Sequence, residues 1–156
     1  MGGGLKMHLE ESIVFLKPKN FDKYAEIIPY LDDSLRNFEK SIPIHILPIP
    51  ESLIRNHYAN IKGKSFYEPT INAFLEAEDG IILMVYRGNN IIERIREIIG
   101  DTDPQKAKPG TIRHIFSNDS LDQAYKERRY LNNVIHASAN KKDAERERSI
   151  WKCYLE

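Results

Sequence analysis

Short apolar runs alternate with amphipathic stretches along this chain, and the alternation predicts a mixed α/β fold. Residues 81–86 (IILMVY) are almost wholly apolar, which is typical of a strand buried on both faces. Residues 12–17 are rich in β-branched and aromatic side chains and end before Pro18, which indicates a second strand. Residues 43–48 are bounded by prolines and suit an edge strand, and residues 133–137 form a last short strand.

Helical periodicity is clearest over residues 90–99, where isoleucines repeat along one stripe and Gly100 closes the helix. Another helix is predicted to start from a cap at Asn20 and to run past Tyr30, with Pro29 as a kink or an early stop. Shorter helices are predicted over residues 51–58 and 65–78, and a terminal helix is predicted to begin at Asn140, with Asp143 as its capping-box partner.

The remaining segments are polar. Residues 100–113 contain prolines and glycine and indicate a loop. Residues 118–130 are highly charged, so we expect them to be exposed, with a helix as one option, and we expect the segment 118–132 to lie near the site or at a subunit contact. The order β-α-β-β-α-β with one helical insertion predicts an α+β sandwich of the ferredoxin-like type, a four-stranded antiparallel sheet covered by helices. We predict a flexible tail over residues 1–10 and a single domain over residues 11–156.

Composition narrows the classes of function. The chain has 156 residues, and its 23 lysines and arginines balance 23 acidic residues, which disfavours a broadly basic nucleic-acid-binding surface. The single cysteine, Cys153, excludes an internal disulfide and is typical of a reducing compartment. No apolar run approaches the ~18 residues of a membrane span. We therefore expect a cytoplasmic globular protein with no membrane association.

The strongest candidate for chemistry is His136, which lies on a short apolar strand that leads directly into a capped helix. Helix starts favour anions, and imidazole is a competent nucleophile near neutral pH. A core histidine satisfied by a hydrogen bond is the alternative. Glu147 falls within the apolar stripe of the terminal helix, where a carboxylate needs a partner, and the imidazole of His136 is a natural one. Pairing of Glu147 with Arg148 or Lys152 on the surface remains equally open.

A second group of residues suits phosphate. The segment 108–113 (KPGTIR) combines a glycine, a hydroxyl donor and Arg113, while Thr102 and Arg96 lie close to it in sequence. Lys17 ends a buried strand, and strand ends in α/β folds commonly line sites. The chain has neither the phosphate-binding loop GxxxxGK[ST] nor the dinucleotide motif GxGxxG, so separate side chains must hold any phosphates.

These motifs together resemble the nucleoside diphosphate kinase family over nearly the whole chain. The segment 108–113 is followed in order by 133–138 (NVIHAS) and by 144–147 (AERE) before Trp151. The family pattern around the histidine reads Asn, two residues, His, Gly or Ala, Ser, Asp, and this chain matches it through Ser138. The resemblance implies a phosphotransferase that moves the γ-phosphate of a nucleoside triphosphate to a nucleoside diphosphate by a ping-pong mechanism.

The resemblance also implies roles for single residues. His136 would carry the phosphate, Glu147 would position its ring, Ser138 would support both, and Tyr58 would pack beside the histidine. The nucleotide would be held by Lys17 on the terminal phosphate and ribose, by Phe66 stacked on the base, by Arg96, Thr102 and Arg113 on the phosphates, and by Asn133 on the ribose. Mg²⁺ would arrive with ATP, GTP or another nucleotide rather than in a protein cage. Members of the family form tetramers or hexamers, so a homo-oligomer is expected.

Three departures from the family pattern stand out. Ala139 replaces an aspartate, Lys19-Asn20 replaces Asp-Gly, and the charged segment 118–132 makes the chain between Arg113 and the histidine strand longer than is usual. Such changes leave open a ferredoxin-like module that binds nucleotide or protein with weakened catalysis. A nucleic-acid-binding protein would rest on the basic residues of 126–129 and 141–142 alone.

Overall fold

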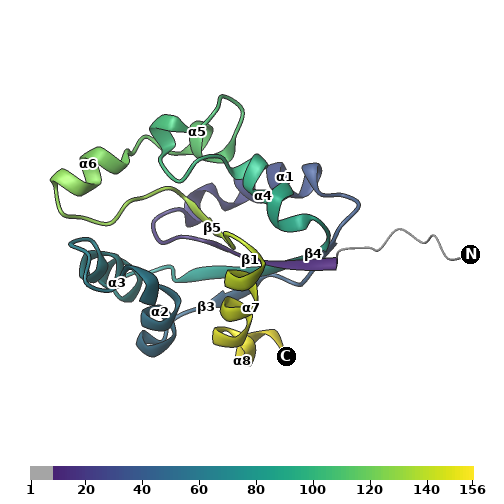
Figure 1. Ribbon diagram of the computed structural model, residues 1–156, viewed down its shortest axis with the longest axis horizontal. Helices are drawn as coiled ribbons and strands as arrows, with labels where there is room; N and C mark the ends of the chain where they lie inside the picture. Colours follow the sequence, from purple (N-terminus) through teal and green to yellow (C-terminus); the bar gives the residue numbers. More distant parts are fainter. Residues whose placement is uncertain (1–8) are drawn as a thin grey trace, which may run out of the picture.

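The computed structural model describes residues 9–156, in which strands and helices alternate as the apolar pattern predicts (Figure 1). The strands are β1 (Leu9–Leu16), β2 (Glu39–Lys40), β3 (Ile44–Ile46), β4 (Ile81–Asn89) and β5 (Ile135–Ala137). The α-helices are α1 (Tyr24–Ser34), α2 (Glu51–His57), α3 (Tyr67–Leu75), α4 (Ile91–Ile99), α5 (Ile112–Phe116), α6 (Leu121–Lys126), α7 (Lys141–Ile150) and α8 (Lys152–Leu155). Short 3-10 turns lie at η1 (Phe21–Lys23), η2 (Ala59–Ile61) and η3 (Pro104–Lys106). None of the helices between residues 9 and 156 is long and apolar enough to cross a membrane.

The strands form one antiparallel sheet with the order β2-β4-β1-β5. Strand β3 also pairs with β4, opposite residues 81–83, while β2 pairs with residues 86 and 87 of the same strand. Because β1 occupies the other edge of β4, the two short strands share one position and the sheet has four positions. This confirms the predicted ferredoxin-like sandwich, and within the described chain β3 has only β4 as its neighbour, as an edge strand does.

Both faces of the sheet are covered by helices, because successive residues of a strand point to opposite faces. Val14 and Leu16 of β1 pack with α1 and α4 on one face, and Ile13 and Phe15 pack with α2, α3 and α7 on the other (Figure 1). Residues 81–86 of β4 are all buried, as their uninterrupted apolar run predicts. The strand ends and the helices on either side therefore define the surroundings of the site.

The first strand begins within the segment predicted to be a tail. Leu9 and Glu10 pair with Asn89 and Gly88 of β4, so this part of the predicted 1–10 tail is ordered strand. The rest of the predicted tail, residues 1–8, lies outside the described residues.

Helix α1 differs from its prediction at Asn20, and at Pro29 the early-stop alternative is wrong. The side chain of Asn20 does not cap a helix; its amide donates to the carbonyls of Lys17 and Pro18 and to Asn132 Oδ1 at 2.8 Å. Pro29 does not stop the helix, which continues to Ser34. Pro29 lies on the exposed side of α1, where the carbonyl left without an N–H partner can face water. Tertiary contacts therefore replace the local capping signal.

The predicted loop contains more regular structure than expected, and the charged segment is partly helical. The predicted loop 100–113 includes η3 and the start of α5, where the Thr111 side chain caps the helix by accepting from the His114 N–H. The charged segment 118–130 contains α6 and is mostly exposed, but its last residue, Tyr130, is buried in the core on the α2 and α3 side. The charged side chains face outwards and the aromatic ring faces inwards, as burial costs require.

Candidate active site

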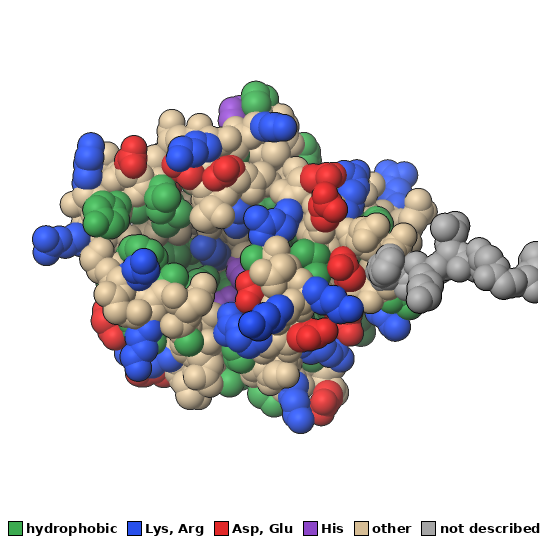
Figure 2. All heavy atoms as spheres, in the orientation of Figure 1, with side chains coloured by type: hydrophobic (Ala, Val, Ile, Leu, Met, Phe, Trp, Pro, Cys, Tyr) green, Lys and Arg blue, Asp and Glu red, His purple; other side chains and the backbone are tan. Residues whose placement is uncertain are grey.

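A cavity of about 400 Å³ opens where the ends of β1 and β5 meet α2, α3, α4, α6 and α7. In Figure 2 it is the hollow near the centre of the face, with histidine side chains at its bottom and basic side chains beside it. Every residue assigned to the site from the sequence lines this cavity except Ser138, which lies just behind it. The residues that line the cavity are Lys17, Tyr58, Phe66, Arg96, Thr102, Arg113, Asn133, His136 and Glu147.

The His136 ring is held by a buried carboxylate. Its Nε2 lies 2.9 Å from Oε1 of Glu147, which is only 3% exposed. The Ser138 hydroxyl donates to the same Oε1 at 2.7 Å and accepts from the Ile13 backbone N–H at 2.9 Å. A carboxylate oxygen accepts, so Nε2 carries the ring proton and Nδ1 keeps its lone pair. The inward partner for Glu147, which the sequence left open, is therefore His136.

Aromatic rings restrain His136 further. It stacks on Phe15 with centroids 4.7 Å apart and meets the edge of His57 at 4.4 Å. Tyr58, predicted to pack beside the histidine, contacts His57 at 4.8 Å and so lies one ring away. The sequence drew no attention to His57, because a single histidine on a short helix carries no local signal of function.

The protonation of His57 follows from its own partner. Trp151 donates its indole N–H to His57 Nδ1 at 3.1 Å, so the proton of the neutral ring is on Nε2. Burial, together with the nearby His136, Arg146 and Lys17, holds the pKa of His57 well below its usual range. Although His57, His136 and Glu147 are close enough to share a metal ion, this tautomer leaves His57 without a free lone pair. Within this cluster His136 is hydrogen-bonded to Glu147 and contacts the edge of the His57 ring.

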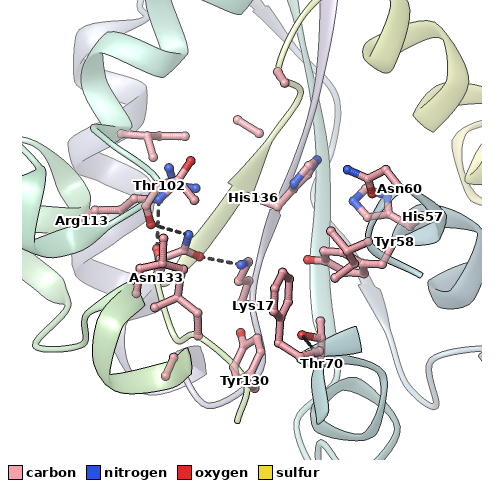
Figure 3. Close-up of a pocket in the computed structure, with 18 of the residues that line it drawn as sticks. Lys17, His57, Tyr58, Asn60, Thr70, Thr102, Arg113, Tyr130, Asn133 and His136 are labelled. Carbon is pink, nitrogen blue, oxygen red and sulfur yellow. Dashed lines mark hydrogen bonds between the residues drawn. The ribbon is translucent and has the colours of Figure 1, made fainter. Parts of the chain in front are cut away.

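Lys17 and Asn133 form a chain of hydrogen bonds across the pocket (Figure 3). Lys17 Nζ donates to Asn133 Oδ1 at 2.5 Å, and Asn133 Nδ2 donates to the Thr102 carbonyl at 2.9 Å. Backbone pairing sets this up, because the Lys17 N–H donates to the Val134 carbonyl and so continues the β1–β5 ladder. Thr102 thus contributes its backbone carbonyl to the network, while its exposed side chain stays available to a ligand.

The ammonium of Lys17 is in a costly environment. Burial, and then the positive charge of Arg113, lowers its pKa from 10.5 to about 7. A lysine whose charge is destabilised in this way gains most when an anion enters its site. The position therefore favours an anionic ligand.

Arg113 has a structural role in addition to the phosphate-binding role that the sequence indicates. Its Nε, Nη1 and Nη2 donate to the carbonyls of Asn133, Gly100 and Ile135 at 3.2, 3.0 and 2.8 Å. A guanidinium has five N–H donors, so two remain for a ligand. Burial, and then Arg96, lowers its pKa to about 10, which keeps it charged at neutral pH. Arg113 therefore ties the α5 region to β5 as well as facing the pocket.

The remaining site residues lie at the border of the cavity. Arg96 is exposed and donates to the Ala139 carbonyl at 3.0 Å, a contact that does not depend on the side chain at position 139. Phe66 is half-buried immediately before α3. The Tyr58 hydroxyl is buried and has no hydrogen-bond partner among the described residues, and burial and Glu147 raise its pKa.

Comparison with known proteins identifies the family to which this chain is similar. The model of the nucleoside diphosphate kinase family matches residues 10–153. The chain belongs to the nucleoside diphosphate kinase family. The nucleoside diphosphate kinase of Pyrococcus furiosus is 33% identical over 147 residues, which cover 92% of this chain and 83% of that protein. The enzyme of Methanocaldococcus jannaschii is 34% identical over 144 residues, covering 91% of this chain and 92% of its own.

Solved nucleoside diphosphate kinases share the fold. The Borrelia burgdorferi enzyme, solved as a transition-state mimic with vanadate and ADP, superposes with a TM-score of 0.77 at 29% identity and covers 92% of this chain and 86% of its own. The Halobacterium salinarum enzyme in complex with CDP gives a TM-score of 0.75 at 26% identity, covering 92% and 88%. This protein is accordingly a transferase of the nucleoside diphosphate kinase type, as its motifs predict.

Proposed function

We propose that this nucleoside diphosphate kinase transfers phosphate in two half-reactions through Nδ1 of His136. The observation that carries the proposal is the pairing of His136 Nε2 with Glu147, because it leaves Nδ1 as the ring nitrogen with a lone pair. In the first half-reaction a bond forms between Nδ1 and the γ-phosphorus, and the bond from that phosphorus to the β–γ bridging oxygen breaks. In the second, a β-phosphate oxygen of another diphosphate takes the phosphoryl group from Nδ1.

Glu147 and Ser138 serve this chemistry by holding charge and orientation. Phosphorylation at Nδ1 makes the ring more positive, and the adjacent carboxylate stabilises that charge through the Nε2–H bond. The Ser138 hydroxyl fixes the carboxylate in turn. Tyr58 packs on His57, whose ring contacts the edge of His136, and so supports the position of the nucleophile.

The cationic side chains hold the phosphates. Lys17, Arg96 and Arg113 line one cavity with His136, so a triphosphate placed there has its charge offset where it reacts. Asn133 lines the same cavity and is linked to Lys17, which supports its proposed contact with a ribose hydroxyl. Phosphoryl transfer depends mainly on positioning and electrostatics, and these residues supply both.

Mg²⁺ fits this site as a partner of the nucleotide. The cavity lining among the described residues has two carboxylates, Asp143 and Glu147, and Glu147 is already engaged with His136 and Ser138. A protein cage for the ion is therefore lacking in this lining, and phosphate oxygens are the natural ligands. When bound, the ion would neutralise phosphate charge, while Lys17 and Arg113 hold the same oxygens from the protein side.

Labelling with γ-³²P-ATP tests the proposal. The enzyme is expected to acquire acid-labile label on His136 and to lose it when unlabelled diphosphate is added. ATP, GTP and pyrimidine nucleotides are all expected to serve. Binding of nucleotide without label would instead support a module with weakened catalysis and would contradict the proposal.

Replacing Phe66 with alanine is expected to raise the KM for every nucleotide by a similar factor, about five-fold or more. Stacking on an aromatic ring supplies ~1–3 kcal/mol and has no hydrogen-bond code for the base. Steady-state kinetics with adenine, guanine and cytosine diphosphates measure the effect. A large change for one base alone would contradict the role given to Phe66.

The activity of the free enzyme is expected to fall as the pH rises through about 7, because Lys17 then loses its charge. The sign follows from its lowered pKa: the protonated, phosphate-binding form predominates below about 7 and the neutral form above it. The pH profile of kcat/KM reports groups of the free enzyme and so measures this limb. In Lys17→Met the limb should vanish at a lower overall rate, and its persistence there would assign it to another group.

We further propose that residues 11–156 act as one domain that assembles into a symmetric homo-oligomer, a tetramer or a hexamer. All five strands belong to one sheet, and a net charge of zero offers little repulsion between copies. Sedimentation at working concentration is expected to give a species of at least four chains. A stable monomer would rule the assembly out.

A further inference from the structure

The cavity has two chemically different ends. Lys17, Asn133 and His136 lie at its buried end, where polar and charged groups converge. Its mouth carries large apolar side chains, among them Leu121 and Tyr125 of α6, which are 43% and 64% exposed. A nucleotide has the same polarity, with an anionic tail and a flat base. The two ends therefore orient a bound nucleotide with its phosphates inside and its base at the mouth.

Two walls frame this mouth. One comes from the chain before α3 and carries Phe66, and the other is α6. Figure 1 shows α6 and α3 on opposite sides of the sheet, at the same end of the molecule. Phe66 and Tyr125 thus line the same cavity from two different elements. Leu121 and Tyr125 of α6 are large apolar side chains left partly in solvent beside the cavity, which indicates a surface for a ligand.

The α6 wall is fixed in place by the segment that carries it. Arg129 donates from Nη1 and Nη2 to the two carboxylate oxygens of Asp119 at 2.7 and 2.8 Å. This ion pair joins the two ends of the segment 119–129 that contains α6. Asp119 also accepts from the Asn132 N–H, and the Leu121 N–H donates to Asp103. The first turn of α6 is thus tied to the 100–111 loop, which borders the phosphate end of the cavity. A wall held this way needs little ordering when a ligand binds.

We infer that α6 forms the second wall of the base-binding site and that Tyr125 stacks on the face of the nucleobase opposite Phe66. The inference rests on the proposed function, because it takes the phosphates to lie beside His136. Its ligand class is any purine or pyrimidine base, since the contact is made by a ring and needs no hydrogen bond from the tyrosine hydroxyl. The charged segment 118–132 is then a part of the substrate site.

A donor without a base provides the test. Labelling of His136 is measured at limiting concentration with γ-³²P-ATP and with ribose 5-triphosphate labelled at its terminal phosphate. Tyr125→Ala is expected to slow labelling by ATP about five-fold or more, in line with the low end of base–aromatic stacking, and to leave the base-free donor unaffected. Tyr125→Phe should behave as the wild type. Gln123→Ala, a neutral truncation on the same helix outside the cavity lining, is the matched control.

The outcomes separate this inference from the proposed function. An equal loss with both donors, or no loss with ATP, would overturn the role of Tyr125 while leaving the phosphohistidine reaction intact. Slower ATP labelling in Gln123→Ala of the same size would also overturn it, because the effect would then belong to the helix as a whole. Absence of label in the wild type with either donor would refute the proposed function itself.

Discussion

The variant His136→Ala is expected to lose at least about a thousandfold of its phosphotransfer activity and all acid-labile label, because the Nδ1 nucleophile is removed. The variant should still fold. The ring lies at the cavity wall with its side chain 16% exposed, and its loss leaves the apolar side chains of the two buried clusters in place. Exchange between γ-³²P-ATP and a second diphosphate measures the activity, and circular dichroism checks the fold.

A matched control is available on α5. His114 is exposed and outside the cavity lining, so His114→Ala should retain wild-type exchange and label. Substantial exchange in a folded His136→Ala protein would refute the histidine mechanism. In Glu147→Gln the amide oxygen can still accept a hydrogen bond from Nε2 of His136, but the negative charge is gone. This variant is therefore expected to show an intermediate loss of kcat with little change in KM.

Removal of Arg113 is expected to damage both activity and stability. Arg113→Ala should lower kcat/KM by about a hundredfold or more, since one charged donor to the transferring phosphate is lost. It should also reduce the free energy of unfolding by about 2–4 kcal/mol, because three carbonyls of Gly100, Asn133 and Ile135 lose a charged donor. Exchange assays and thermal unfolding in the absence of nucleotide measure the two effects separately.

Arg148→Ala provides the comparison for Arg113. Arg148 is 44% exposed and pairs with Glu11 on the surface, so its loss should leave activity unchanged and alter stability by less than ~1 kcal/mol. Lysine at position 113 should recover part of the activity, through its charge, but little of the stability, because it lacks the planar fork that reaches three carbonyls. Unchanged thermal stability in Arg113→Ala would contradict the structural half of its role.

Much of the site could be anticipated from short sequence motifs. The segments 108–113 and 133–138 and the apolar-stripe position of Glu147 named the residues that the fold brings into one cavity. Local signals also gave the cap at Asn140, whose side chain accepts from the Asp143 N–H as predicted. The signal failed at Asn20, where a residue with good capping chemistry is recruited by Asn132, more than a hundred residues further along the chain.

The order of the elements, the buried central strand and the choice of candidate site residues followed from the sequence itself, because periodicity, caps and motifs act between neighbouring residues. Tertiary structure alone decided which long-range contacts form: the edge of His57 against His136, the tautomer set by Trp151, the lowered pKa of Lys17 and the position of α6 at the mouth. These depend on strand register and on how helices pack across a sheet. Burial and distance between remote segments, which set pKa and hydrogen bonding, arise only when those segments meet.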